Sequence, residues 1–188
     1  MKNTALVIID IQNDYFSNGV LALDGAIDAA NKAQNLLDTF RDKQLPIIHI
    51  QHETIKQEMG FMLPGSYGQK IHESVEPLAE EVCFTKHYPN AFWQTNLEAY
   101  LNEHNIEHLI LTGMMTHMCV STTARAAMER GFRTTIIQDA CATSTLEFDG
   151  AVIPEETVHK TALAELTMIS GITPLKSFLA GEFDIRIE

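Results

Sequence analysis

The sequence predicts one α/β domain that spans residues 1–188 and is built on a mostly parallel sheet. Short apolar runs rich in β-branched residues recur along the chain, and helical patterns separate them. Such runs are typical of strands buried on both faces of a parallel sheet. Strands that alternate with helices indicate right-handed crossover connections. No repeat, low-complexity tract or linker composition divides the chain, so we expect a single domain.

The apolar runs predict five strands and a weaker sixth. The five cover residues 5–9, 47–50, 82–85, 108–112 and 134–138, and the sixth covers residues 167–172. Asp10 closes the first run, the third leads into Lys86, and Gly113 and Asp139 end the fourth and the fifth. Polar residues and glycines at these points are ordinary ends for buried strands.

Four helices are predicted, over residues 25–44, 95–104, 116–130 and 154–166. The first has apolar residues at i, i+3 and i+4, which is the pattern of an amphipathic helix. Gly131 ends the third helix, and Pro154 suits the first turn of the fourth. Residues 52–75 show no periodicity, and a segment of this length is either a lid or contact surface or a mobile surface excursion.

Charge and cysteine content restrict the function. Thirteen Lys and Arg against 25 Asp and Glu give a net charge of −12, which disfavours nucleic acid and anionic membrane surfaces as partners. Cys83, Cys119 and Cys141 form no C-x-x-C, which argues against a disulfide framework or a zinc ribbon. The apolar stretch after the amino terminus is too short for a signal peptide or a membrane span. We therefore expect a cytoplasmic protein in a reducing compartment.

Three reactive residues follow predicted strands. Asp10 follows the first strand, Lys86 follows the third, and Cys119 lies just past the fourth. The ligand crevice of an open parallel sheet lies beyond the carboxyl ends of its strands, so we expect these side chains at one edge. A thiol, a carboxylate and an ammonium can serve there as nucleophile, base and electrostatic partner.

The three cysteines have different expected environments. Cys119 is predicted in the first turn of a helix capped by Thr116, where the helix dipole favours the thiolate. The alternative is a buried cysteine that acts as a small hydrophobic residue. Cys83 is interpreted as core packing within the third strand. Cys141 lies near the same sheet edge without an evident activator.

Three segments resemble the signature segments of the isochorismatase-like cysteine hydrolases. They are DIQNDYF at residues 10–16, KHYPNAF at 86–92 and TGMMTHMCV at 112–120. QDACA at 138–142 resembles the ending of the fifth strand in that family. The resemblance extends over residues 4–166 in order and spacing, and the three segments together make a specific match.

The resemblance implies a three-layer Rossmann-like sandwich with a six-stranded, mostly parallel sheet. It implies a catalytic triad of Asp10, Lys86 and Cys119, and an oxyanion hole formed by the backbone N–H groups of Met115 and Cys119. It also implies a cis peptide bond between Met114 and Met115. Members of the family commonly form homo-oligomers, and the long loop and apolar residues near the carboxyl terminus are candidate contacts, namely Phe178, Leu179, Phe183 and Ile185.

The leading functional hypothesis is hydrolysis of an amide bond through a cysteine thioester. Tyr15, Trp93 and Met118 are candidate contacts to a small, partly apolar or cyclic substrate, whereas Phe16 and Phe92 are expected in the core. One alternative is hydrolysis of an isochorismate-type vinyl ether with Asp10 as the acid. Another is a binding protein on the same scaffold, without catalysis.

Neither a metal nor a cofactor is expected. The nicotinamidase branch of the family carries a metal-binding Asp-x-His after strand two, where this chain has His52-Glu53-Thr54. His49 and His52 are three residues apart in a predicted extended segment, and their side chains point to opposite faces. His87 and His117 lie nearest the expected site, as pocket hydrogen-bond partners or as solvated loop residues.

Overall fold

A six-stranded parallel sheet forms the centre of the computed structural model, which describes residues 2–182. The strands are β1 (Thr4–Ile9), β2 (Ile47–His52), β3 (Val82–Lys86), β4 (His108–Met114), β5 (Arg133–Ala142) and β8 (Gly171–Thr173). Their order is β3-β2-β1-β4-β5-β8, and every neighbouring pair is parallel. The predicted sheet is confirmed, although its sixth strand begins at Gly171 rather than at residue 167.

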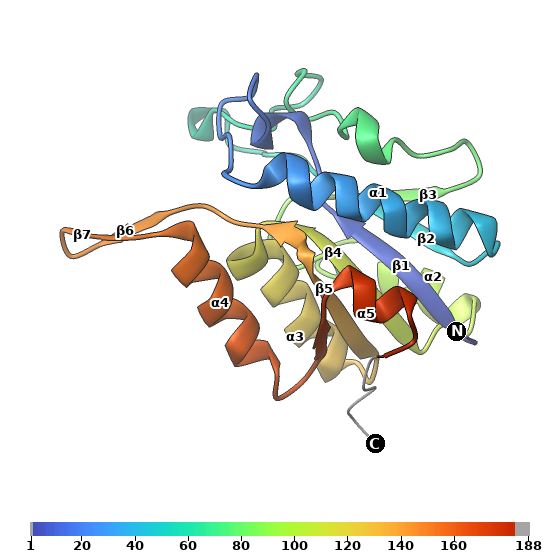
Figure 1. Ribbon diagram of the computed structural model, residues 1–188. Helices are drawn as coiled ribbons and strands as arrows, with labels where there is room; N and C mark the ends of the chain where they lie inside the picture. Colours follow the sequence, from blue (N-terminus) through green and yellow to red (C-terminus); the bar gives the residue numbers. More distant parts are fainter. Residues whose placement is uncertain (1, 183–188) are drawn as a thin grey trace.

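Helices cover both faces of the sheet and complete the three layers (Figure 1). They are α1 (Ala26–Asp42), α2 (Leu97–Glu103), α3 (Ser121–Glu129), α4 (Glu155–Leu166) and α5 (Leu175–Leu179). Alternate residues of β1 separate two cores: Leu6 and Ile8 pack with α1 and α5, and Val7 packs with α2, α3 and α4. No helix in residues 2–182 is long and apolar enough to cross a membrane.

A two-stranded hairpin that the sequence patterns did not predict follows β5. Its strands are β6 (Leu146–Phe148) and β7 (Ala151–Ile153), which pair antiparallel. Figure 1 shows this hairpin projecting from the body of the protein beside α4. Of the apolar residues proposed near the carboxyl terminus, Phe178 is buried and Leu179 is exposed, whereas Phe183 and Ile185 lie outside the described residues.

Two local predictions were wrong. Cys83 is exposed, because β3 is the edge strand of the sheet and its residues alternate between more and less exposed positions. Thr116 does not cap a helix, because Met115 occupies the N-cap position and a π-helical turn (Thr116–Val120) precedes α3. The Thr116 hydroxyl instead donates to the Ala142 carbonyl at 3.2 Å and lies 2.9 Å from Nδ1 of His159.

The segment between β2 and β3 includes two 3-10 turns (Gln57–Met59 and Glu73–Val75) and folds back over the sheet edge. Gln12 attaches its beginning, because its side-chain oxygen accepts the His52 N–H at 2.7 Å. Its side-chain nitrogen lies 2.8 Å from the His52 carbonyl oxygen and 2.6 Å from that of Gln69. Both backbone groups of His52 are therefore held by one buried side chain.

Asn13 and Asp14 attach the middle of the same segment. The Asn13 side chain donates to the Tyr67 carbonyl at 3.1 Å, and an Asp14 carboxylate oxygen accepts the Met62 N–H at 2.5 Å. A Cβ at Gly68 would lie 2.0 Å from the Asp14 carboxylate, so only glycine permits this approach. We call Gln12, Asn13 and Asp14 the clasp. The clasp therefore attaches both the beginning and the middle of the segment to the sheet edge, and we call residues 53–81 the covering segment.

Candidate active site

Asp10, Lys86 and Cys119 meet at the carboxyl ends of the strands. The Asp10 carboxylate directly follows β1, Lys86 is the last residue of β3, and both side chains are fully buried. Lys86 Nζ lies 2.7 Å from Asp10 Oδ2 and donates a hydrogen bond to Cys119 Sγ at 3.3 Å. The lysine therefore links the carboxylate to the thiol.

The end of β4 brings the thiol to this point. Gly113 has a φ of 129°, and a Cβ there would lie 1.9 Å from the Ile9 carbonyl oxygen, so only glycine allows β4 to approach β1 so closely. The Met114–Met115 peptide bond is cis, as the resemblance implied. The π-helical turn then carries Cys119, with 7% of its surface exposed, toward Lys86.

Lys86 has a third partner that sequence reasoning missed. Its Nζ lies 3.1 Å from Nδ1 of His52. An ammonium group has three N–H donors, and its three neighbours here are the Asp10 carboxylate as an ion pair, and Cys119 Sγ and His52 Nδ1 as hydrogen-bond partners. A signal was present in the predicted strands, because parallel pairing places His52 directly beside Lys86 at the ends of β2 and β3.

Burial determines the protonation of the site. It raises the pKa of the Cys119 thiol to about 12, and the neighbouring Asp10 carboxylate adds to the rise while Lys86 opposes it. Burial therefore opposes the thiolate that a helix dipole would favour. Burial and the Lys86 charge lower the pKa of His52 to about 4, so its imidazole is neutral.

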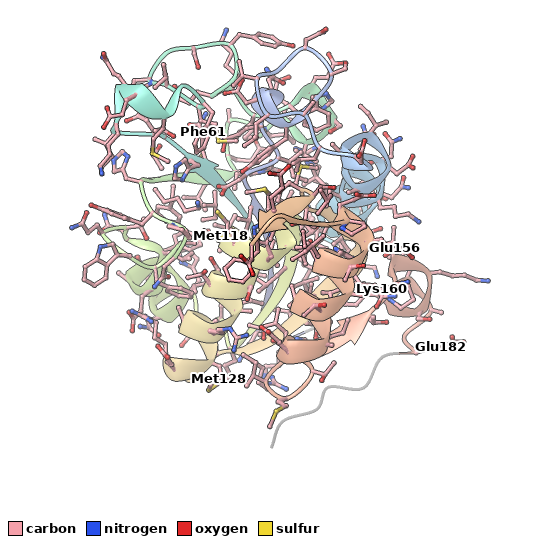
Figure 2. The ribbon with its side chains drawn as sticks, turned by 90° about the vertical axis from the view of Figure 1, so that its left-hand side faces the viewer. Phe61, Met118, Met128, Glu156, Lys160 and Glu182 are labelled. Atoms are coloured by element: carbon pink, nitrogen blue, oxygen red, sulfur yellow. The ribbon has the colours of Figure 1, made fainter. Side chains whose placement is uncertain are left out.

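A cavity of about 310 Å³ opens beside the thiol. Most of its wall is apolar and comes from the covering segment and from the turns after β1, β3 and β4. Figure 2 marks two wall residues, Phe61 in the covering segment and Met118 beside the thiol. The lining residues are Tyr15, His52, Thr54, Ile55, Lys56, Met59, Phe61, His87, Tyr88, Pro89, Met115, Met118 and Cys119.

The predicted substrate contacts divide between two locations. Tyr15 and Met118 line the cavity, and so does Met115, whose amide belongs to the expected oxyanion hole. Trp93 is 52% exposed and does not line the cavity. Phe16 and Phe92 are buried in the core, as expected. Closeness in sequence to the Lys86 segment was therefore a poor guide, because residues 91–94 form a turn in which Trp93 is exposed.

The histidines occupy separate environments. His87 lines the cavity, and its Nδ1 lies 2.9 Å from the Glu53 carbonyl oxygen, whereas His117 pairs with Thr143 outside the cavity. His49 faces Glu81 and His52 faces Lys86, so the two side chains do diverge. Within residues 2–182, no three His, Cys, Asp or Glu side chains are grouped so that they could hold a metal ion.

Comparisons with known proteins agree with this architecture. A profile described as the isochorismatase domain matches residues 4–172. YddQ, an isochorismatase family protein of Bacillus subtilis, is 44% identical over 163 residues, which are 87% of this chain and 91% of the relative. A crystal structure of an isochorismatase-family protein from Oleispira antarctica superposes with a TM-score of 0.92 at 39% identity. That alignment covers 96% of this chain and 98% of the crystallised one.

A more distant relative carries the name of a reaction. The maleamate amidohydrolase of Pseudomonas putida is 28% identical over 152 residues, which cover 73% of this chain and 71% of the enzyme. Its similarity therefore extends across about three quarters of this chain and of the enzyme.

Proposed function

The chain belongs to the isochorismatase family of hydrolases, and from this membership we propose that it is a cysteine-dependent amidohydrolase. The observation that carries the proposal is the contact of one buried ammonium with both a carboxylate and a thiol, and the thiol lines a largely apolar cavity. An acid–base group beside a nucleophile is the arrangement that acyl transfer requires. The amidohydrolase among the relatives supports the same choice of bond.

In the first half of the reaction, Cys119 Sγ attacks the amide carbonyl carbon while Asp10 takes the thiol proton. The high pKa of the thiol makes this base necessary, because little thiolate is present beforehand. The carbonyl oxygen gains the negative charge, which the backbone N–H groups of Met115 and Cys119 stabilise. Asp10 then gives its proton to the leaving nitrogen, the C–N bond breaks, and an acyl thioester and a free amine remain.

In the second half, water cleaves the thioester. Asp10 removes a proton from the water as its oxygen attacks the acyl carbon, and the C–S bond breaks. The proton returns to the sulfur, so the thiol and the carboxylate are restored. Burial lowers the pKa of Lys86, but its interactions with Asp10 and Cys119 outweigh that effect and raise the pKa, so Lys86 keeps its charge during the reaction. Its ammonium therefore orients Asp10 and offsets the negative charge that develops at Sγ.

The cavity favours a compact, largely apolar acyl group. Its volume of about 310 Å³ lies at the small end of ligand pockets. Ile55, Met59 and Phe61 form much of the wall away from the thiol. We therefore propose small amides with an uncharged acyl group as the substrate class.

The test is a panel of small primary amides and esters assayed with the wild-type protein, Cys119→Ala and Cys83→Ala. We expect turnover by the wild type and by Cys83→Ala, because Cys83 lies exposed on the edge strand. Cys119→Ala should be inactive, and acid quenching should trap an acyl adduct on Cys119 that mass spectrometry detects. Hydrolysis that survives in Cys119→Ala would favour acid catalysis by Asp10, as in vinyl-ether cleavage, and no turnover of any compound would favour a binding protein.

A further inference from the structure

We propose that His52 is a substrate-binding residue whose Nε2–H donates a hydrogen bond to the acyl group, so that the site prefers amides carrying an uncharged nitrogen or oxygen acceptor. The proposal deepens the proposed function and rests on it for the bond that is cleaved. Of the three residues that contact Lys86, His52 alone has no part in the proposed reaction steps, and the proposal gives it one.

The histidine ring is held on several sides. Gln12 binds both backbone groups of His52, at 2.7 and 2.8 Å. Lys86 Nζ contacts the ring at Nδ1, and the Phe61 ring stacks on it with centroids 6.1 Å apart and planes inclined by 12°. A side chain so restrained loses little conformational freedom on binding a ligand.

The contact with Lys86 also sets the tautomer. An ammonium group can only donate, so Nδ1 of His52 is the acceptor and the ring proton resides on Nε2. The low pKa of His52, about 4, keeps this neutral form across the physiological range. Within residues 2–182, Nε2 of His52 has no hydrogen-bond partner, and the side chain lines the cavity.

A second polar group on the same wall points to the same ligand chemistry. Thr54 lines the cavity, is 2% exposed, and its buried Oγ1 has no hydrogen-bond partner within the described residues. Polar groups left unpaired when a ligand displaces water weaken binding. His52 and Thr54 therefore favour a ligand that brings a polar atom to an otherwise apolar wall.

The test compares benzamide with the three pyridinecarboxamides, each of which replaces one ring C–H by an acceptor nitrogen. Dissociation constants are measured by calorimetry in Cys119→Ala protein, so that no probe is consumed. At least one pyridinecarboxamide should bind about three- to tenfold more tightly than benzamide, the effect of one net hydrogen bond. Its binding should also shift the Nε2–H proton resonance of His52, and benzamide should not.

Two substitutions of His52 in the Cys119→Ala protein distinguish the role of Nδ1 from that of Nε2. His52→Asn keeps an acceptor near Nδ1 for Lys86 but removes the donor. The ratio of the dissociation constants of benzamide and the preferred pyridinecarboxamide should therefore fall to about one. His52→Gln places an amide N–H near Nε2 and should retain the preference. His104→Asn, at the exposed end of α2, is the control and should change nothing. Thermal unfolding confirms that each variant is folded.

Equal affinity for all four probes, binding of none of them, or a preference that persists in His52→Asn would overturn the proposal. If His52→Asn does not fold, an unchanged Nε2–H resonance on addition of the pyridinecarboxamides would overturn it instead. Failure of the proposed amidohydrolase function gives a different experimental result from failure of the His52 proposal. In that case the wild type hydrolyses no amide, although the Cys119→Ala protein still shows a preference that depends on His52.

Discussion

Two buried clusters of charge, each with a histidine from β2, differ in how completely their carboxylates are paired. In the Glu81 cluster, Arg41 binds both oxygens of Glu81, at 2.7 and 2.9 Å. The Leu78 N–H donates to the same carboxylate at 3.0 Å, and His49 Nε2 lies 2.9 Å away. This carboxylate joins α1, β2 and the turn before β3, and its hydrogen-bonding capacity is used.

In the Lys86 cluster, Asp10 is less completely paired. Its Oδ2 forms an ion pair with Lys86 Nζ at 2.7 Å, but in the described part of the chain neither buried oxygen of Asp10 makes a well-aligned hydrogen bond. A carboxylate with an open oxygen can accept a proton, whereas one bound on all sides is held in its ionised form. The carboxylate of the Glu81 cluster is fully paired, as suits a structural role, and that of the Lys86 cluster is incompletely paired, as suits the proposed base.

The largest effect is expected for Asp10→Asn, which tests whether the Lys86 cluster supplies the base. The amide is nearly isosteric but cannot take the thiol proton, so we expect kcat/KM to fall by about 10²–10⁴-fold. Thermal unfolding should show that the protein remains folded. Activity above about a tenth of the wild-type value would mean that Asp10 is not the base.

Glu81→Gln should instead reduce stability and leave activity nearly unchanged. The neutral amide weakens the charged hydrogen bonds to Arg41, and the free energy of unfolding should fall by about 1.5–3 kcal/mol. Turnover of the same amide at 25 °C should stay within about twofold of wild type, because Glu81 lies outside the cavity lining. Urea denaturation and steady-state kinetics measure the two effects, and a large loss of activity in a folded protein would contradict the separation.

A fall in pH should lower the stability of the wild type more than that of Glu81→Gln. Burial raises the pKa of Glu81, but the hydrogen bonds from Arg41, Leu78 and His49 outweigh it and lower the pKa to about 2. Since the folded-state pKa lies below the unfolded value of about 4.3, the stabilisation is complete above that pH and declines as the pH falls toward 2. The stability difference between wild type and Glu81→Gln should therefore narrow over this range, and a constant difference would refute the assignment.

The smallest expected effect is that of metal removal. His52 stands where the nicotinamidase branch has a metal-binding aspartate, and its Nδ1 is engaged by Lys86. Dialysis against a chelator should leave the turnover rate unchanged within error. Loss of activity that zinc, iron or manganese restores would make His52 the first candidate ligand.

The positions of Asp10, Lys86 and Cys119 could be predicted because each follows a strand, and parallel strands end at a common edge. Buried apolar runs made the sheet predictable for the same reason. The cis peptide bond and the oxyanion hole came from the family resemblance, since no local pattern of residues indicates them. The protonation of Cys119 depends on burial, which helix position alone does not determine.

The cavity wall could not be predicted. Residues 52–75 have no periodicity, and their path depends on side chains distant in sequence, such as Gln12 and Asp14. The exposure of Cys83 depends on which strand lies at the sheet edge, which is a property of strand order rather than of the strand itself. Trp93 was misplaced because closeness in sequence to the Lys86 segment says little about the direction of a side chain in a turn.

The clasp has an evolutionary consequence. Gln12, Asn13 and Asp14 follow Asp10 within four residues, so one short stretch of chain carries both the proposed base and the anchors of the cavity wall. Ile55 and Met59 contact the cavity although they are 60% and 54% exposed, and neither is bound by the clasp. Under the proposed function, mutations at these two positions should change which acyl group fits while the anchors and charges persist. Descendants of such a gene would then acquire new substrates while inheriting the proposed reaction.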